Sequence, residues 1–181
     1  GYPISLARGA YWLGAAYEKL NENDLSNKYY TEAAEFPMTY YGQLAFNKIN
    51  PGGNFELKDQ SFFDKDYEKE FKKNKLIRHL ILLKELNATQ LGKDIFKHLA
   101  DLNIDKGSEV LAAELATNLE RYDFAIQISK KASYEKRFYN TYNYPIINTP
   151  KIINNKPMPK QEIVLAIIRQ ESEFDKSANS W

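Results

Sequence analysis

The sequence predicts an all-α protein built as an α-solenoid, a superhelix of stacked helix pairs. The chain has 181 residues, of which only 8 are Gly, while Ala, Leu, Lys and Glu are frequent. This composition favours helices, because glycine weakens a helix and those four residues have high helix propensity. No segment sustains an apolar and polar alternation, and no Asn-Gly or Asp-Gly dipeptide marks a hairpin. Small and aromatic side chains instead recur three and four positions apart, as in packed helix pairs.

The first helix pair is predicted near the start of the chain. Residues 5–20 carry small and aromatic side chains at helical spacing, and a polar break at 21–24 follows. Asp24 is a candidate N-cap for a second helix, since its carboxylate can accept hydrogen bonds from the first turn. We expect the second helix to end near Pro37, because proline cannot continue a helix.

This predicted pair resembles a tetratricopeptide unit. The run Leu13-Gly14-Ala15-Ala16-Tyr17 matches the L-G-x-x-Y core of that pattern, although Ala10 stands where the pattern prefers Trp. Later residues fall near its aromatic, small and proline positions: Tyr30, Ala33 and Pro37. Small residues let two antiparallel helices approach closely, and aromatic side chains fill the space between neighbouring pairs.

Further helices are predicted after the clearest loop, residues 50–54. Three segments have helical patterns: 62–73, 75–86 and 89–100. A weaker repeat of the first pair lies in 108–133, with a turn at Arg121-Tyr122-Asp123. Its small positions are Ala113, Ala116, Ala125 and Ala132. Together these segments predict a helical-repeat superhelix over residues 1–138.

The composition changes after this region. Residues 139–158 are predicted to form a connector, because prolines interrupt an irregular stretch at Pro145, Pro150 and Pro157. A strongly apolar helix follows, with Pro159 near its start and Glu162 in its first turn. Residues 159–181 therefore read as the opening of a second domain. The chain opens on Gly1 without Met and stops at Trp181 after a motif-like run, so we expect a longer parent protein.

Composition excludes several classes of protein. The chain has 25 Lys+Arg against 24 Asp+Glu, a net charge of +1, which argues against a nucleic-acid or anionic-membrane partner. It has no Cys and only 2 His, so disulfides, thiol catalysis and a His-rich metal site are not expected. No apolar run approaches the roughly 18 residues of a membrane span. No nucleotide or metal-binding motif is present, and we expect no cofactor.

The terminal helix carries the candidate catalytic residue. Val164, Ile167 and Ile168 form one apolar stripe. Glu171 continues this stripe at helical spacing, whereas Glu173 lies about 200° further round the helix. Burial raises the pKa of a carboxyl, and such a group is suited to general-acid catalysis. The alternative is a structural Glu at the edge of the core with its carboxylate in water, and the periodicity leaves that alternative open.

Several motifs resemble one enzyme family. The run Ala166-Ile167-Ile168-Arg169-Gln170-Glu171-Ser172-Glu173-Phe174 is similar to the A-x-I-R-Q-E-S-x-aromatic signature that opens the catalytic domain of soluble lytic murein transglycosylases. Ala178 and Ser180 stand where that family has A-x-S, and Tyr144-Pro145 resembles the Tyr-Pro shortly before its catalytic domain. Upstream, residues 10–14 and 40–45 (AYWLG and YYGQLA) resemble the helical-repeat segment of the same enzymes.

The resemblance implies a peptidoglycan lyase. Members cleave the β-1,4 bond between N-acetylmuramic acid and N-acetylglucosamine in the periplasm without a cofactor and form 1,6-anhydro products. The catalytic Glu of the family corresponds to Glu171, and its substrate-binding Ser to Ser180; Ser172 is expected to support the helix end. The resemblance also implies that residues 159–181 begin a lysozyme-like domain and that the partner is a glycan strand.

One departure from the family pattern limits this expectation. The family continues with G-A-x-G-L-M-Q and with later motifs that shape the cleft, and none of these follows Trp181 in the sequence. We therefore expect residues 1–181 by themselves to be inactive on glycan strands. The alternative function is a protein-interaction scaffold of tetratricopeptide type without catalysis. In that case Glu171 is incidental, and the concave face of the helical repeats binds a peptide of a protein partner.

Overall fold

The computed structural model describes residues 2–57, 59, 65–101 and 106–179. It is mainly helical, with two short strands among the described residues, and this confirms the predicted all-α class. The chain divides into two compact units, Gly1–Lys58 with Ser133–Arg137, and Asp59–Ala132 with Phe138–Trp181. The predicted boundaries at 138 and 158, the superhelix and the lysozyme-like domain stay predictions. No helix in the described part of the chain combines the length and the apolar composition needed to cross a membrane.

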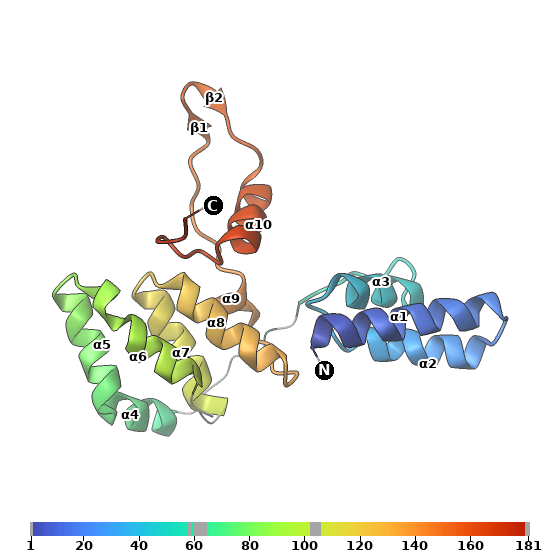
Figure 1. Ribbon diagram of the computed structural model, residues 1–181, viewed down its shortest axis with the longest axis horizontal. Coiled ribbons are helices and arrows are strands. Elements are labelled where there is room, and N and C mark those ends of the chain that lie inside the picture. The colour runs from blue at the N-terminus through green and yellow to red at the C-terminus, as the bar shows by residue number, and fades with distance from the viewer. Residues whose placement is uncertain (1, 58, 60–64, 102–105, 180–181) are drawn as a thin grey trace. The chain divides into compact units, whose positions relative to one another are not determined.

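The first unit contains α1 (Pro3–Lys19), α2 (Asn23–Ala34) and α3 (Tyr40–Ile49), which pack on one another (Figure 1). The predicted pair of helices is confirmed as α1 and α2. The predicted N-cap is wrong, because α2 begins at Asn23 and Asp24 lies inside its first turn. An acidic side chain is favourable there as well, since it faces the positive end of the helix dipole.

A close approach between α1 and α2 explains the small residues of the L-G-x-x-Y pattern. A Cβ atom built on Gly14 would lie 2.8 Å from the ring of Tyr30, so only glycine leaves room for that ring. The Ser26 hydroxyl donates to the Gly14 carbonyl oxygen at 3.0 Å, which joins the two helices at the same point. Tyr30 and Ala33 are buried in this core together with residues of the neighbouring helices, Ala10 and Ala45.

The buried hydroxyl of Tyr30 donates to the Glu18 carboxylate at 2.7 Å. We predict that Tyr30→Phe lowers the opening free energy of α1 and α2 amides by about 0.5–1.5 kcal/mol, the usual net value of one hydrogen bond. The loss is expected near the lower end, because Glu18 is partly exposed and keeps its ion pair with Lys48. Hydrogen exchange of these amides measures the effect. Tyr29→Phe is the matched control, and an equal loss in both variants would contradict the assignment.

The third helix, α3, was not predicted from the apolar periodicity. Thr39 caps it, since its Oγ1 accepts a hydrogen bond from the Gly42 amide at 3.0 Å and donates to the Phe36 carbonyl at 2.9 Å. Ala45 is fully buried on its packed face. The sequence YYGQLA therefore begins a capped helix, in which Gly42 lies against Phe36 and Thr39 and Ala45 packs against residues of α1 and α2.

The second unit begins with a run of short helices. They are α4 (Lys65–Lys73), α5 (Lys75–Glu85), a 3₁₀ turn η1 (Thr89–Gly92), α6 (Lys93–Asp101), α7 (Lys106–Asn118) and α8 (Tyr122–Ser133). The predicted helix at 75–86 is confirmed, and the one at 89–100 is a 3₁₀ turn followed by α6. The start of the helix predicted at 62–73 lies outside the described residues.

The core of this unit is formed by α5, α6, α7 and α8. Phe96 and Phe124 stack with ring centroids 4.8 Å apart, and aliphatic side chains surround them. The predicted small positions of α7 and α8 are confirmed as buried: Ala113, Ala116, Ala125 and Ala132. At the predicted turn, the Arg121 guanidinium forms two hydrogen bonds with the nearly buried Asp123 carboxylate, at 3.0 and 2.7 Å, which fixes the start of α8.

The predicted connector has more structure than its prolines indicate. It contains α9 (Asn140–Asn143) and an antiparallel hairpin of β1 (Ile152–Ile153) and β2 (Lys156–Pro157), which is at the top of Figure 1. The connector was expected to be irregular, but Asn154 and Asn155 adopt positive φ angles of 51° and 62° and form the two-residue turn of this hairpin without an Asn-Gly or Asp-Gly dipeptide. Helix α10 (Gln161–Glu171) follows, with Glu162 in its first turn as predicted.

Candidate functional site

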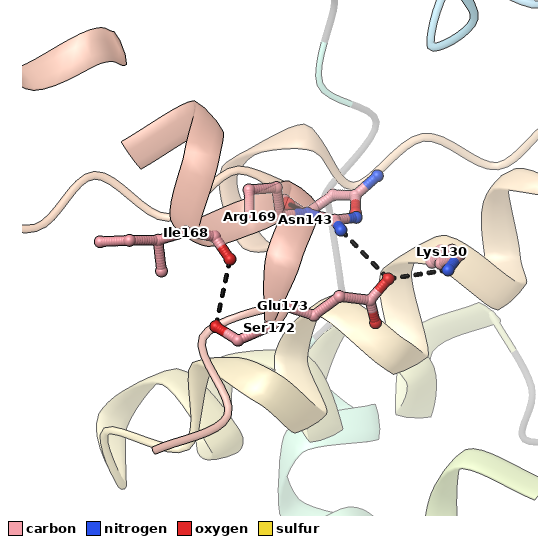
Figure 2. A network of polar contacts seen from close by, with 6 residues as sticks. All are labelled: Lys130, Asn143, Ile168, Arg169, Ser172 and Glu173. Atoms are coloured by element: carbon pink, nitrogen blue, oxygen red, sulfur yellow. Dashed lines mark hydrogen bonds and ion pairs between the residues drawn. The ribbon is translucent and has the colours of Figure 1, made fainter. Parts of the chain in front are cut away.

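Helix α10 carries the predicted catalytic residue at its last position. The backbone N–H of the next residue, Ser172, donates to the Ile168 carbonyl at 3.1 Å, and the Ser172 hydroxyl donates to the same oxygen at 3.2 Å (Figure 2). These two hydrogen bonds satisfy a carbonyl that the end of the helix would otherwise leave without a partner. Ser172 therefore supports the helix end, as expected from the sequence.

The packed face of α10 differs from the predicted stripe. Its partly buried side chains are Gln161, Val164, Leu165, Ile168 and Arg169, whereas Ile163 and Ile167 are 50% and 56% exposed. At about 100° per residue, this face is centred roughly a quarter of a turn away from the stripe of Val164, Ile167 and Ile168. Arg169 lies on the packed face because its guanidinium bonds to Asn143 of α9, and an apolar pattern cannot predict such a polar contact.

Glu171 is exposed and lies on the same side of α10 as Ile163 and Ile167, at spacings of eight and four residues. The expectation that it faces the core of this unit is therefore wrong. Its side chain forms no hydrogen bond or ion pair with another described residue. Within the described part of the chain, the structure thus presents a carboxylate without a polar partner beside two half-exposed side chains, Ile163 and Ile167. Ser180, the predicted substrate-binding residue, lies outside the described residues.

Glu173, unlike Glu171, forms ion pairs among the residues that the structure describes. Its Oε1 accepts hydrogen bonds from Lys130 Nζ of α8 at 2.7 Å and from Arg169 Nη1 of α10 at 3.2 Å (Figure 2). Arg169 also donates from Nε and Nη2 to the carbonyl and side-chain oxygens of Asn143, at 3.0 and 2.8 Å. This network joins α8, α9 and α10. The sequence pattern missed it, because it involves residues 26 to 43 positions apart.

The ion pairs of Glu173 determine its titration. Burial alone raises the pKa of the Glu173 carboxyl. The hydrogen bond from Lys130 and the positive charges of Lys130 and Arg169 together lower this pKa by a larger amount, so it lies below the ordinary value. The stability that these ion pairs provide is present above the ordinary pKa of 4.5 and is lost as the pH falls through the lower folded value. We predict that the Glu173 side-chain carbon has an NMR titration midpoint below 4.5. A midpoint at or above 4.5 would show that the carboxylate is not paired in solution.

A groove of about 450 Å³ lies between α10 and the segment that precedes the hairpin. One wall is formed by Tyr144, Pro145 and Ile146, and the other mainly by Leu165, Ala166 and Arg169. The guanidinium carbon of Arg169 lies 5.7 Å from the centre of the Tyr144 ring, within range of a cation–π contact. The Tyr-Pro that precedes the predicted domain is therefore packed against α10. Glu171 is not among the residues that line this groove.

The described residues contain no cluster of three or more His, Asp or Glu side chains that could hold a metal ion. At the end of α10, the Glu171 carboxylate has no polar partner among the described residues, whereas the Glu173 carboxylate is held in ion pairs. Comparison of the chain with protein-family models, with curated proteins and with solved structures finds no match. The relation to the transglycosylase signature rests on the motif residues themselves.

Proposed function

We propose that this chain belongs to a peptidoglycan lytic transglycosylase, in which Glu171 is the catalytic acid and base. The observation that carries the proposal is the position of Glu171: it ends α10 within the signature 166–174, exposed and without a described partner. In the same proposal, α1–α8 belong to an α-solenoid, and α10 opens a lysozyme-like domain.

The contrast between the two glutamates supports the assignment. A general acid must release its proton to the substrate and recover it, so its carboxylate cannot be held by permanent cations. Lys130 and Arg169 hold the Glu173 carboxylate ionised, whereas Glu171 has no such partner in the part of the chain that the structure describes. Of the two residues, only Glu171 is therefore suited to proton transfer. A second wall over Ile163 and Ile167 would exclude water from the surroundings of Glu171.

The reaction needs a single carboxylate. Glu171 donates its proton to the glycosidic oxygen as the bond to C1 of N-acetylmuramic acid breaks, and the N-acetyl group of the substrate stabilises the cationic C1. The ionised Glu171 then accepts the proton of the muramoyl C6 hydroxyl while that oxygen bonds to C1 and closes the 1,6-anhydro ring. Retaining hydrolases instead use a second carboxylate as nucleophile and then water. Ser180 is the proposed substrate-binding partner, by resemblance.

The helical units have a supporting role in this proposal. Close packing of α1 on α2, through Gly14 and Tyr30, and of α7 on α8, through buried alanines, is what a rigid solenoid requires. Such a frame would hold the catalytic domain against the glycan strand in the periplasm. The proposal also allows protein partners to bind to the helical repeats.

The proposal is tested with the protein as its gene encodes it and, separately, with residues 1–181. Each sample is incubated with purified peptidoglycan sacculi, and soluble muropeptides are analysed by mass spectrometry. We expect anhydro-muropeptides from the gene-encoded protein. No soluble product from it would refute the lyase. Residues 1–181 are expected to release none, and product from them would refute the proposal that a second wall over Glu171 is needed.

A second candidate function is a protein-interaction scaffold of tetratricopeptide type. It is favoured by the aromatic cluster of the first unit, in which Trp12 and Tyr40 are 58% and 70% exposed beside Tyr41. The gene sequence after Trp181 separates the two candidates. The motif G-A-x-G-L-M-Q there supports the enzyme, whereas another helix pair or a stop codon supports the scaffold.

A further inference from the structure

Helix α10 ends in an unusual turn. Glu173 and Phe174 have positive φ angles of 50° and 64°, in the left-handed region. Residues with a Cβ atom are disfavoured there, and two in succession without glycine are uncommon. Such a conformation persists only where surrounding contacts hold it, and strained residues of this kind gather at functional sites.

The contacts that hold the turn come from α8. The Glu173 carboxylate accepts from Lys130 Nζ at 2.7 Å, and the ring of Phe174, which is 8% exposed, packs edge-on against Tyr122 with centroids 6.1 Å apart. The turn is closed by a hydrogen bond from the Asp175 amide to the Ser172 carbonyl at 2.9 Å. An ionic anchor and an apolar anchor therefore fix the two left-handed residues to the same helix.

The ionic anchor also reaches back into α10. Arg169 donates to the same Glu173 oxygen at 3.2 Å, and Asn143 of α9 holds the other nitrogens of the guanidinium (Figure 2). Glu171 lies between Arg169 and Glu173 in sequence and has no described side-chain partner of its own. The direction of its side chain therefore depends on the backbone that these two neighbours hold.

We propose that Glu173 is a positioning residue whose carboxylate, by bridging Lys130 and Arg169, fixes the end of α10 and so the direction in which Glu171 leaves the helix. This inference rests on the proposed lyase function. The apolar pattern gives Glu173 no role, and the transglycosylase signature allows any residue at this position. Catalysis is sensitive to such positioning, since a misplacement of about 1 Å can cost roughly 100-fold in rate.

The test uses Glu173→Gln in the gene-encoded protein, with kcat and KM measured for anhydro-muropeptide release. Glutamine keeps the shape of the side chain but loses the charge, so we expect kcat to fall at least about tenfold while KM changes less than about twofold. Lys130→Met is expected to lower kcat to the same extent, and adding it to Glu173→Gln should cause little further loss. Lys130→Arg, which keeps a cation, should restore most of the activity.

Glu120→Gln is the matched control, because Glu120 forms an exposed ion pair with Lys176 in the same unit and has no proposed role. Its kcat should equal that of the unmodified protein. Hydrogen exchange gives a second readout: amides 172–175 should exchange faster in Glu173→Gln than in Glu120→Gln.

The outcomes separate the two proposals. If the unmodified protein forms no anhydro product, the lyase function fails and the positioning role fails with it. If the unmodified protein is active but Glu173→Gln and Lys130→Met keep kcat within about twofold, the positioning role alone is overturned. An equal loss of kcat in Glu120→Gln would also overturn the positioning role, because removal of any surface charge would then lower kcat.

Discussion

Glu171→Gln is expected to lower kcat for anhydro-muropeptide release by about 10²–10⁴-fold in the gene-encoded protein, the range typical of a lost general acid or base. Glutamine fills the same space but can neither donate nor accept the transferred proton. Because the Glu171 side chain is exposed and has no described partner, the change should leave the fold intact. The measurement is steady-state release of soluble anhydro-muropeptides from sacculi, with helicity compared by circular dichroism.

The Glu120→Gln variant serves again as the control, since it makes the same chemical change at an exposed ion pair, with Lys176, that includes neither Lys130 nor Arg169. Undiminished product from Glu171→Gln would remove Glu171 from the mechanism and favour the scaffold function.

Gly42→Ala is expected to destabilise the packing of α3 strongly. A Cβ atom at this position would lie 2.0 Å from the backbone oxygen of Phe36 and 2.9 Å from Thr39 Oγ1, the atom that caps the helix. A backbone oxygen cannot move aside as a flexible side chain can, so the helix start must shift. Overpacking of this kind costs about 1–3 kcal/mol, and loss of the cap adds about 1 kcal/mol. Hydrogen exchange of the α3 amides measures the change in opening free energy.

Gly9→Ala is the control for this prediction. No atom lies within 4 Å of a Cβ built on Gly9, which is exposed in the middle of α1. Alanine should therefore stabilise that helix by about 0.5–1 kcal/mol, because it restricts the unfolded chain and favours helix. A neutral or stabilising effect of Gly42→Ala would show that α3 does not approach Phe36 as described.

The sequence predicted the helices that have both an apolar period and clear boundaries. Helix α5 is an example, since Asn74 precedes it and its Oδ1 accepts from the Leu76 amide. Helix α3 was missed because Gly42 near its start lowers helix propensity, and the signal that could have found it is the cap at Thr39. The hairpin was missed because prolines dominate the segment, although Asn154-Asn155 between Ile-Ile and Lys-Pro is a usable turn signal.

The identity of the candidate catalytic residue stays a prediction from the motif, and its environment was not predicted. The motif selected Glu171, and the structure gives it an exposed carboxylate at the end of α10, without a polar partner among the described residues. Helical periodicity did not predict the direction of the Glu173 side chain, because α10 stops at Glu171 and the left-handed turn directs the next residues toward α8. The partners that decide the role of Glu173, Lys130 and Arg169, come together only through tertiary packing.

The most direct test of a single-carboxylate lyase is digestion of sacculi in water enriched in oxygen-18. Intramolecular attack by the C6 hydroxyl adds no solvent oxygen and yields a product lighter by one water than the hydrolysis product. We predict anhydro-muropeptides with no oxygen-18 at C1 of the N-acetylmuramic acid. Muropeptides with a reducing end that carries one oxygen-18 would contradict the account, because water would then be the nucleophile.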